Sequence, residues 1–142
     1  MNLDQDFSKK FVIVVRNDLP SWQVMNTVAH CAAYLGNKMK DRFDTGNVFI
    51  TRDDKLHPRN SQYAIVVVKA DEKELKDLMA KVRDSGLLYL GFIREMIETT
   101  DDEEIVRILR DKADSAVEYL GIGIFGKKEE LDPLTKKFSL WK

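Results

Sequence analysis

The chain has 142 residues, of which 44% are hydrophobic and 33% charged, and its formal net charge is -1. This balance is typical of a soluble globular protein and excludes a disordered chain. The near-neutral charge excludes a protein-wide attraction to nucleic acid, so we expect weak RNA binding at most. The length fits a single domain over residues 1–142.

Targeting and metal signals are missing from the sequence. No apolar run approaches the roughly 20 residues that span a bilayer, and the N-terminus has no signal-like pattern. We therefore expect a cytoplasmic protein without a membrane partner. Cys31 is the single cysteine, and His30 and His57 are the only histidines. These counts predict no disulfide and no metal site, and the absence of glycine-rich nucleotide motifs predicts no cofactor.

The first elements in chain order are a strand and a helix joined by a tight turn. The unbroken apolar run from Phe11 to Val15 predicts a strand buried on both faces. Asp18-Leu-Pro-Ser21 has the composition of a turn, and we expect Ser21 to be the N-cap of a helix from Trp22 to about Lys38.

Strands and helices continue to alternate along the rest of the chain. Residues 37–61 are polar and predict a long loop that holds a short strand at 47–51. Alternation of this kind indicates an α/β protein with a layered sheet. The later elements are expected as strands at 63–69, 87–93 and 118–125, and as helices at 71–84, from 101, and from 127 to about 138.

The turn after the first strand carries polar and aromatic side chains at a helix N-terminus, where free N–H groups favour anionic or polar ligands. An aromatic wall and amide groups there can stack on and hydrogen-bond a planar ligand. The alternative is that the tryptophan shields the core while the amides hold the long loop. The candidate ligand-binding residues are Asn17, Asp18, Trp22, Gln23 and Asn26.

Several segments together resemble a known family. The stretches Val14-Val-Arg-Asn-Asp-Leu19, Ala29-His-Cys-Ala-Ala33, Ala64–Lys69 and Leu120–Gly126 resemble the type II peptidyl-tRNA hydrolases. The pattern Trp22-Gln-x-x-Asn-x-x-Ala29 with Arg94–Thr99 is similar to an uncharacterised, mostly bacterial branch of that fold, domain of unknown function 2000. The resemblance implies a three-layer α/β/α sandwich with a mixed, mostly parallel central sheet of about four main strands.

The resemblance also implies catalytic residues. Glu95 and Thr99 match, by type and spacing, an acid and a threonine that follow the third main strand in the hydrolases. Glu95 would act as a base or orient water, and Thr99 would bond a carbonyl or water. The alternative is a surface glutamate and a threonine that caps the next helix. The lysine- and glycine-rich turn of those enzymes is replaced here by Pro20-Ser-Trp-Gln-Val-Met25, which removes a cation that could stabilise an oxyanion.

We therefore expect a peptidyl-tRNA hydrolase-like protein that binds a small polar ligand or a tRNA-linked acylated adduct. One alternative is an active hydrolase of peptidyl-tRNA or a related ester or amide, with a lysine from elsewhere, such as Lys69. Another is a noncatalytic interaction protein, and the sequence is also compatible with a homodimer.

Overall fold

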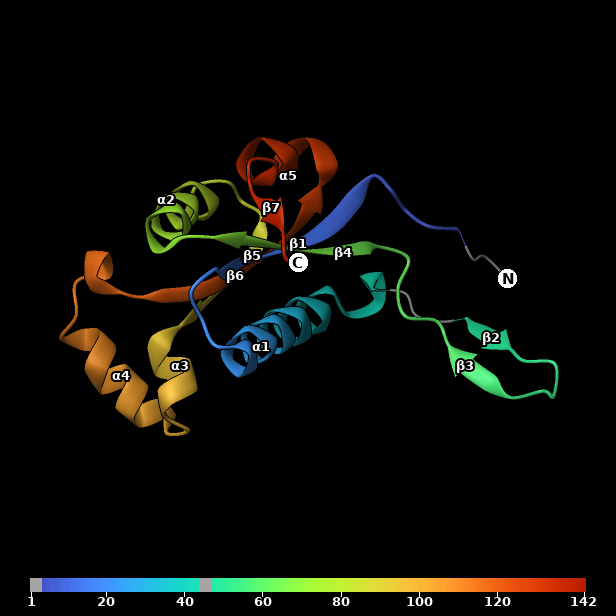
Figure 1. The fold of residues 1–142 in the computed structure, drawn as a ribbon, viewed down its shortest axis with the longest axis horizontal. Helices are drawn as coiled ribbons and strands as arrows, with labels where there is room; N and C mark the ends of the chain where they lie inside the picture. The colour runs from blue at the N-terminus through green and yellow to red at the C-terminus, as the bar shows by residue number, and fades with distance from the viewer. Residues whose placement is uncertain (1–3, 44–46) are drawn as a thin grey trace.

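The computed structural model describes residues 4–43 and 47–142, and its main feature is a five-stranded sheet with helices on both faces (Figure 1). The order of the strands across the sheet is β5-β6-β1-β4-β7. The strands are β1 (Lys9–Arg16), β4 (Ala64–Ala70), β5 (Leu88–Ile93), β6 (Tyr119–Lys127) and β7 (Ser139–Leu140).

The sheet is mixed, as expected, but the expectation that it is mostly parallel is wrong. Only the β1–β4 pairing is parallel, whereas β1–β6, β5–β6 and β4–β7 are antiparallel. Helical and strand periodicity reports which segments are buried and carries no information about strand direction, which depends on where each connection returns to the sheet. The short β7 was not predicted.

The four longer helices fall at the expected places, with small shifts at their ends, whereas the short helix α3 was not predicted. Helix α1 packs on one face of the sheet, and α2 and α5 cover the other (Figure 1). The two short helices α3 and α4 lie between β5 and β6 in the sequence. The helices are α1 (Ser21–Met39), α2 (Glu72–Arg83), α3 (Arg94–Glu98), α4 (Asp102–Arg110) and α5 (Lys128–Thr135), with short 3-10 turns η1 (Lys40–Arg42) and η2 (Asp114–Ala116).

Strand β1 supplies core residues to both faces, because successive side chains of a strand point in opposite directions. Val12 and Val14 pack in the core that contains residues of α2 and α5. Ile13 and Val15 pack in the core that contains residues of α1. The buried apolar run that predicted this strand is therefore explained by a layer of helix on each side.

Helix α1 lies very close to β6 because β6 has glycines under it. A Cβ atom at Gly121 would lie 2.5 Å from Cγ2 of Thr27, and one at Gly123 would lie 2.8 Å from Cβ of Cys31. Burial raises the pKa of the Cys31 thiol to about 12, so this cysteine is a core residue. The close packing fixes the start of α1 over the middle of the sheet.

Three helix starts differ in how they are capped. The expected N-cap at Ser21 is wrong, because Pro20 occupies that position and no side chain caps α1. Asp71 caps α2 through a complete capping box with Glu74. Asp101 caps α4 by accepting bonds from the N–H groups of Glu103 and Glu104.

The expected loop at 37–61 contains more structure than predicted. Strand β2 (Val48–Ile50) confirms the short strand, and it pairs with an unpredicted strand β3 (Leu56–Pro58) in a separate two-stranded sheet. This hairpin extends away from the five-stranded sheet (Figure 1). Residues 44–46 of the expected loop lie outside the described residues.

Two further observations complete the fold. The apolar stripe of α4, formed by Ile105, Ile108 and Leu109, is only half-buried. Among the described residues, no helix combines the length and apolar character needed to span a membrane.

Candidate functional site

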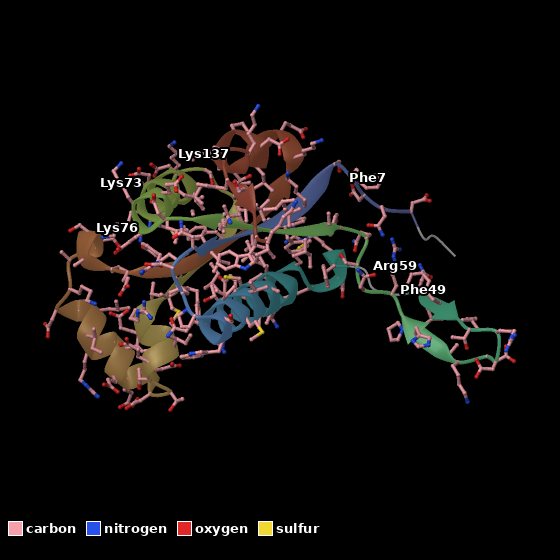
Figure 2. All side chains as sticks on the ribbon, viewed as in Figure 1. Phe7, Phe49, Arg59, Lys73, Lys76 and Lys137 are labelled. Atoms are coloured by element: carbon pink, nitrogen blue, oxygen red, sulfur yellow. The ribbon has the colours of Figure 1, made fainter. Side chains whose placement is uncertain are left out.

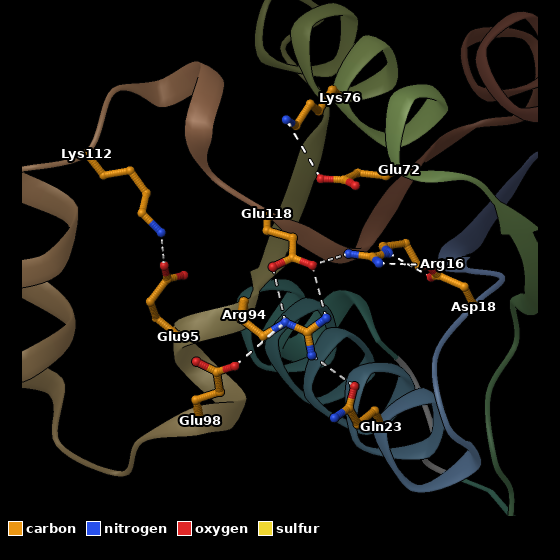
Figure 3. Close-up of polar contacts among 10 residues, drawn as sticks. All are labelled: Arg16, Asp18, Gln23, Glu72, Lys76, Arg94, Glu95, Glu98, Lys112 and Glu118. Atoms are coloured by element: carbon orange, nitrogen blue, oxygen red, sulfur yellow. Dashed lines mark hydrogen bonds and ion pairs between the residues drawn. The ribbon is translucent and has the colours of Figure 1, made fainter.

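The candidate site lies where β1 ends, because three other chain segments reach the same place. Strand β6 runs antiparallel to β1, so Glu118, directly before β6, lies beside Arg16 at the end of β1. The end of β5 is also there, since the N–H of Arg94 donates to the carbonyl of Glu118 over 3.0 Å. The first turn of α1 completes the junction (Figure 3).

Two arginines hold the carboxylate of Glu118. Arg16 Nη1 donates to Glu118 Oε1 at 2.5 Å, and Arg94 donates from Nη2 to Oε1 at 3.1 Å and from Nε to Oε2 at 3.2 Å. The hydrogen bonds from Arg94 and then Arg16 lower the pKa of Glu118 to about 2, although burial opposes this shift. Glu118 therefore stays ionised at neutral pH.

Asp18, a predicted ligand-binding residue, is engaged by Arg16. The buried Arg16 donates from Nε to Asp18 Oδ1 at 2.9 Å and from Nη2 to Oδ2 at 2.8 Å. This bidentate bond lowers the pKa of the Asp18 carboxyl and raises that of the Arg16 guanidinium. Asn17 follows Arg16 as an exposed residue whose N–H donates to the carbonyl of Ala70 at 2.9 Å.

The predicted residues of α1 lie in different surroundings. Gln23 Oε1 accepts a hydrogen bond from Arg94 Nη1 at 3.1 Å, which ties α1 to the end of β5. Trp22 is 57% exposed, so it does not shield the core as the alternative interpretation required. Asn26 is half-buried, and among the described residues its amide makes no hydrogen bond.

The N-terminus of α1 adds a polar surface to this junction. No side chain caps this helix, and its first turn contains no acidic residue. The N–H groups of a first helical turn have no intrahelical partners and carry a partial positive charge. The N–H of Gln23 already donates to the carbonyl of Pro20 at 3.0 Å, so a ligand acceptor at this end of α1 would find the N–H groups of Ser21 and Trp22.

The two predicted catalytic residues lie apart from this network. Glu95 is buried on α3, where one carboxylate oxygen pairs with Lys112 and the other has no partner among the described residues. Figure 3 shows Glu95 pointing toward Lys112 and away from the Glu118 carboxylate. The hydroxyl of Thr99 donates to Glu104 Oε2 at 2.9 Å and accepts from the N–H of Asp101 at 3.0 Å. Thr99 thus makes the contacts of a residue at the start of the next helix.

Sequence reasoning missed four charged residues of this region. Arg16, Arg94 and Glu118 form the network, and Lys112 pairs with Glu95. Arg16 and Glu118 carry opposite charges and lie directly at the ends of two predicted strands. That pattern is the signal from which their pairing could have been predicted. The suggested Lys69 lies on β4 opposite Ser139, and its side chain makes no contact with Glu95.

Two clefts lie beside β5 and α4, away from the predicted ligand-binding residues Trp22, Gln23 and Asn26. One cleft, of about 330 Å³, lies between α2, β5 and α4, and the other, of about 490 Å³, lies between α1, β5 and α4. Neither is lined by those residues. Within the described residues, no group of three His, Cys, Asp or Glu side chains could hold a metal ion.

Comparison with known proteins identifies a family and a fold. The family described as "Protein of unknown function (DUF2000)" matches residues 9–142. The solved structure of Atu0240, a protein of unknown function from Agrobacterium tumefaciens strain C58, is similar with a TM-score of 0.82 and 19% identity. That match covers 96% of this chain and 100% of the other. No protein with a curated description matches the sequence.

Proposed function

The chain belongs to the DUF2000 family, and we propose that it binds a small polar ligand, such as an acylated adduct, at the junction of β1, α1 and β5. The observation that carries this proposal is the hydrogen bond between Gln23 and Arg94. It places a predicted ligand-binding amide against a guanidinium that Glu118 holds in a fixed position. The exposed Trp22 is the preceding residue of the same helical turn.

These groups suit a ligand that combines a planar ring with a carbonyl or carboxylate. The ring would stack on Trp22, since an exposed indole offers a large face to a base or an aromatic amino acid. The NH₂ group of Gln23 and the first N–H groups of α1 would donate to the carbonyl oxygen. Asp18, which is 59% exposed in its side chain, is available on the rim to accept from an amine or hydroxyl.

A suitable probe is adenosine that carries phenylalanine in amide linkage at its 3′ carbon, because it imitates an acylated tRNA end and resists hydrolysis. Binding should raise the melting temperature with probe concentration by mass action. Trp22→Leu should weaken binding about tenfold through loss of stacking. Met25→Leu, at an equally exposed position of α1, should have no effect. No rise in melting temperature up to the solubility limit of the probe would reject the proposal.

An active hydrolase of peptidyl-tRNA is the second candidate, and its support is the resemblance in the segment Arg94–Thr99 together with the lysine found beside Glu95. Without a turn lysine, cleavage of peptidyl-tRNA should be slower than that of an authentic type II enzyme by on the order of a hundredfold or more. Glu95→Gln should abolish any activity if Glu95 is the base, while Glu98→Gln, an exposed acid on the same helix, should leave it unchanged. Equal rates for both variants would exclude this role of Glu95.

A noncatalytic interaction protein is the third candidate, favoured by the β2–β3 hairpin. Phe49, Ile50 and Leu56 are large apolar residues at least 48% exposed, and Phe49 lies far from the main sheet (Figure 2). A two-stranded sheet is marginally stable alone, so a second copy of the chain packed against it would stabilise it. Sedimentation velocity of the wild type and of Ile50→Ser/Leu56→Ser tests this candidate. A monomer at all concentrations would exclude the homodimer.

A further inference from the structure

The smaller of the two clefts, of about 330 Å³, has the character of a ligand site, and we call it the α2 cleft. It lies on the sheet face opposite α1, so it is separate from the junction that carries the proposed function. Most of its wall is apolar or aromatic, contributed by α2, β5, α3, α4 and the residues around the start of β6: Met79, Tyr89, Met96, Leu109, Val117 and Tyr119. A mostly apolar cleft with a few polar groups is typical of a site for a small molecule.

The floor of the α2 cleft is shaped by a glycine of the edge strand. A Cβ atom at Gly91 would lie 2.6 Å from Cε of Met79 and 3.0 Å from Cε1 of Tyr119. The absence of a side chain lets Met79 and Tyr119 close directly onto the strand. These two side chains thus form a continuous apolar floor with the backbone of β5.

The charged groups that face the α2 cleft are two donors, Arg83 and Lys112, and one acid, Asp114, which is bonded to Arg83. Arg83 gives two hydrogen bonds to Asp114 and one, from Nη2, to the hydroxyl oxygen of Tyr119 at 2.8 Å. Asp114 therefore has both carboxylate oxygens engaged, whereas Tyr119 keeps its own O–H for a ligand. Burial raises the pKa of Tyr119, which keeps this hydroxyl protonated.

Lys112 is the second donor. Its ammonium pairs with one oxygen of Glu95, which lies behind it and does not line the cleft. An ammonium has three N–H donors, so the single bond to Glu95 leaves two for a ligand. The lining of the α2 cleft contains two positive side chains, Arg83 and Lys112, and one negative side chain, Asp114. Its wall therefore carries one net positive charge.

We propose that the α2 cleft binds a small amphipathic carboxylate, whose apolar body lies on Met79 and Met96 and whose carboxylate accepts from Lys112 and Tyr119. A carboxylate matches two donors and one net positive charge, and the apolar wall replaces water around the body of the ligand. The competing class is an amine that would bond the unpaired oxygen of Glu95. The charge of the ligand separates the two classes.

The probe is 4-phenylbutanoate, compared with 4-phenylbutanol and 4-phenylbutylamine, which share its body and differ in charge. Binding is followed by NMR of ¹³C-labelled methionine methyl groups, because Met79 and Met96 line the α2 cleft and the exposed Met25 of α1 is an internal control. We expect the methyl resonances of Met79 and Met96 to shift to saturation as the carboxylate is added. The alcohol and the amine should bind at least about tenfold more weakly. Tighter binding of the amine, or no saturable shift with any of the three, would overturn the proposal.

Variants of the ion pair test the role of Lys112. Lys112→Met alone would leave the buried Glu95 without a partner, so the informative variant is Glu95→Gln/Lys112→Met, which removes both charges. It should lose most of the preference for phenylbutanoate over phenylbutanol, because only the Tyr119 donor remains, and Glu95→Gln alone should bind the carboxylate more tightly than the wild type because a competing anion is gone. Lys73→Met, at an 86% exposed lysine paired with Asp77 on the outer face of α2 (Figure 2), should behave as the wild type. A preference for the carboxylate that is undiminished in the double variant would contradict the proposal, while the Trp22→Leu result bears on the junction alone.

Discussion

The side chain of Gln23, in the first turn of α1, accepts a hydrogen bond from Arg94 at the end of β5, across 71 residues of sequence and 3.1 Å of space. This bond links α1, which the sequence predicted to hold the ligand, to a charged network that the sequence did not predict. Arg94 is in turn bonded through two nitrogens to Glu118. The position of α1 and the positions of the strand ends are therefore coupled through one guanidinium.

Gln23→Leu should lower the free energy of unfolding by about 0.5–1.5 kcal/mol, the usual contribution of one hydrogen bond. The loss stays small because the Arg94 side chain is 21% exposed and can bond water instead. Urea denaturation measures it. Asn26→Leu, one turn along α1, should cost less, since the Asn26 amide has no hydrogen bond among the described residues. If Asn26→Leu lowered the free energy of unfolding as much as Gln23→Leu or more, the effect of Gln23→Leu would come from packing and not from its hydrogen bond.

Stability in acid should depend on Glu118. The pKa of Glu118 in the folded protein is lowered to about 2, below the usual value of 4.5, so its contribution is present above the unfolded pKa and is lost as the pH falls toward 2. Glu118→Gln should therefore flatten the stability profile between these two pH values. Chemical denaturation across the acid range measures this, with Glu129→Gln, at an exposed residue of α5, as the control. Identical profiles for the wild type and Glu118→Gln would contradict the assignment.

Most elements of the fold could be predicted because local periodicity reports burial. The run Phe11–Val15 lies inside β1, and the helical spacing after Trp22 corresponds to α1. The directions of the strands could not be predicted from this signal, because β6 satisfies the same apolar pattern in either direction. Strand β3 was missed for a different reason, since a strand of three residues carries almost no periodicity.

The candidate site could be predicted only in part for a related reason. Asp18 and Gln23 were found because they lie near a strand-to-helix turn in the sequence. Their partners Arg16, Arg94 and Glu118 were not, because the contacts join residues as far as 102 positions apart, and only the sheet order brings them together. Glu95 and Thr99 were paired by sequence spacing, yet their side chains point to different partners, Lys112 and Glu104.

We expect side-chain removal at the starts of α2 and α1 to have effects of different size. Asp71→Ala should cost about 0.5–2 kcal/mol, because the Asp71 carboxylate accepts from the N–H of Glu74 at 2.8 Å in a capping box. Ser21→Ala should change stability by less than about 0.5 kcal/mol, since Ser21 is already helical and caps nothing. Urea denaturation of both variants under the same conditions checks this. A larger cost for Ser21→Ala would show that the hydroxyl acts at the N-terminus of α1 after all.

Two glycine substitutions test whether the close approach of α1 to β6 fixes the position of the helix. Gly123→Ala should destabilise the protein by about 1–3 kcal/mol, because its Cβ would lie 2.8 Å from Cβ of Cys31 and 3.0 Å from Cδ1 of Leu35. Gly36→Ala, on α1 itself, should stabilise it by about 0.5–1 kcal/mol, because no atom lies within 4 Å of the new Cβ and alanine favours the helix. Urea denaturation gives both values. If Gly123→Ala were as stable as the wild type, α1 would be free to move outward, and the Gln23–Arg94 bond would then be expected to weaken in the same variant.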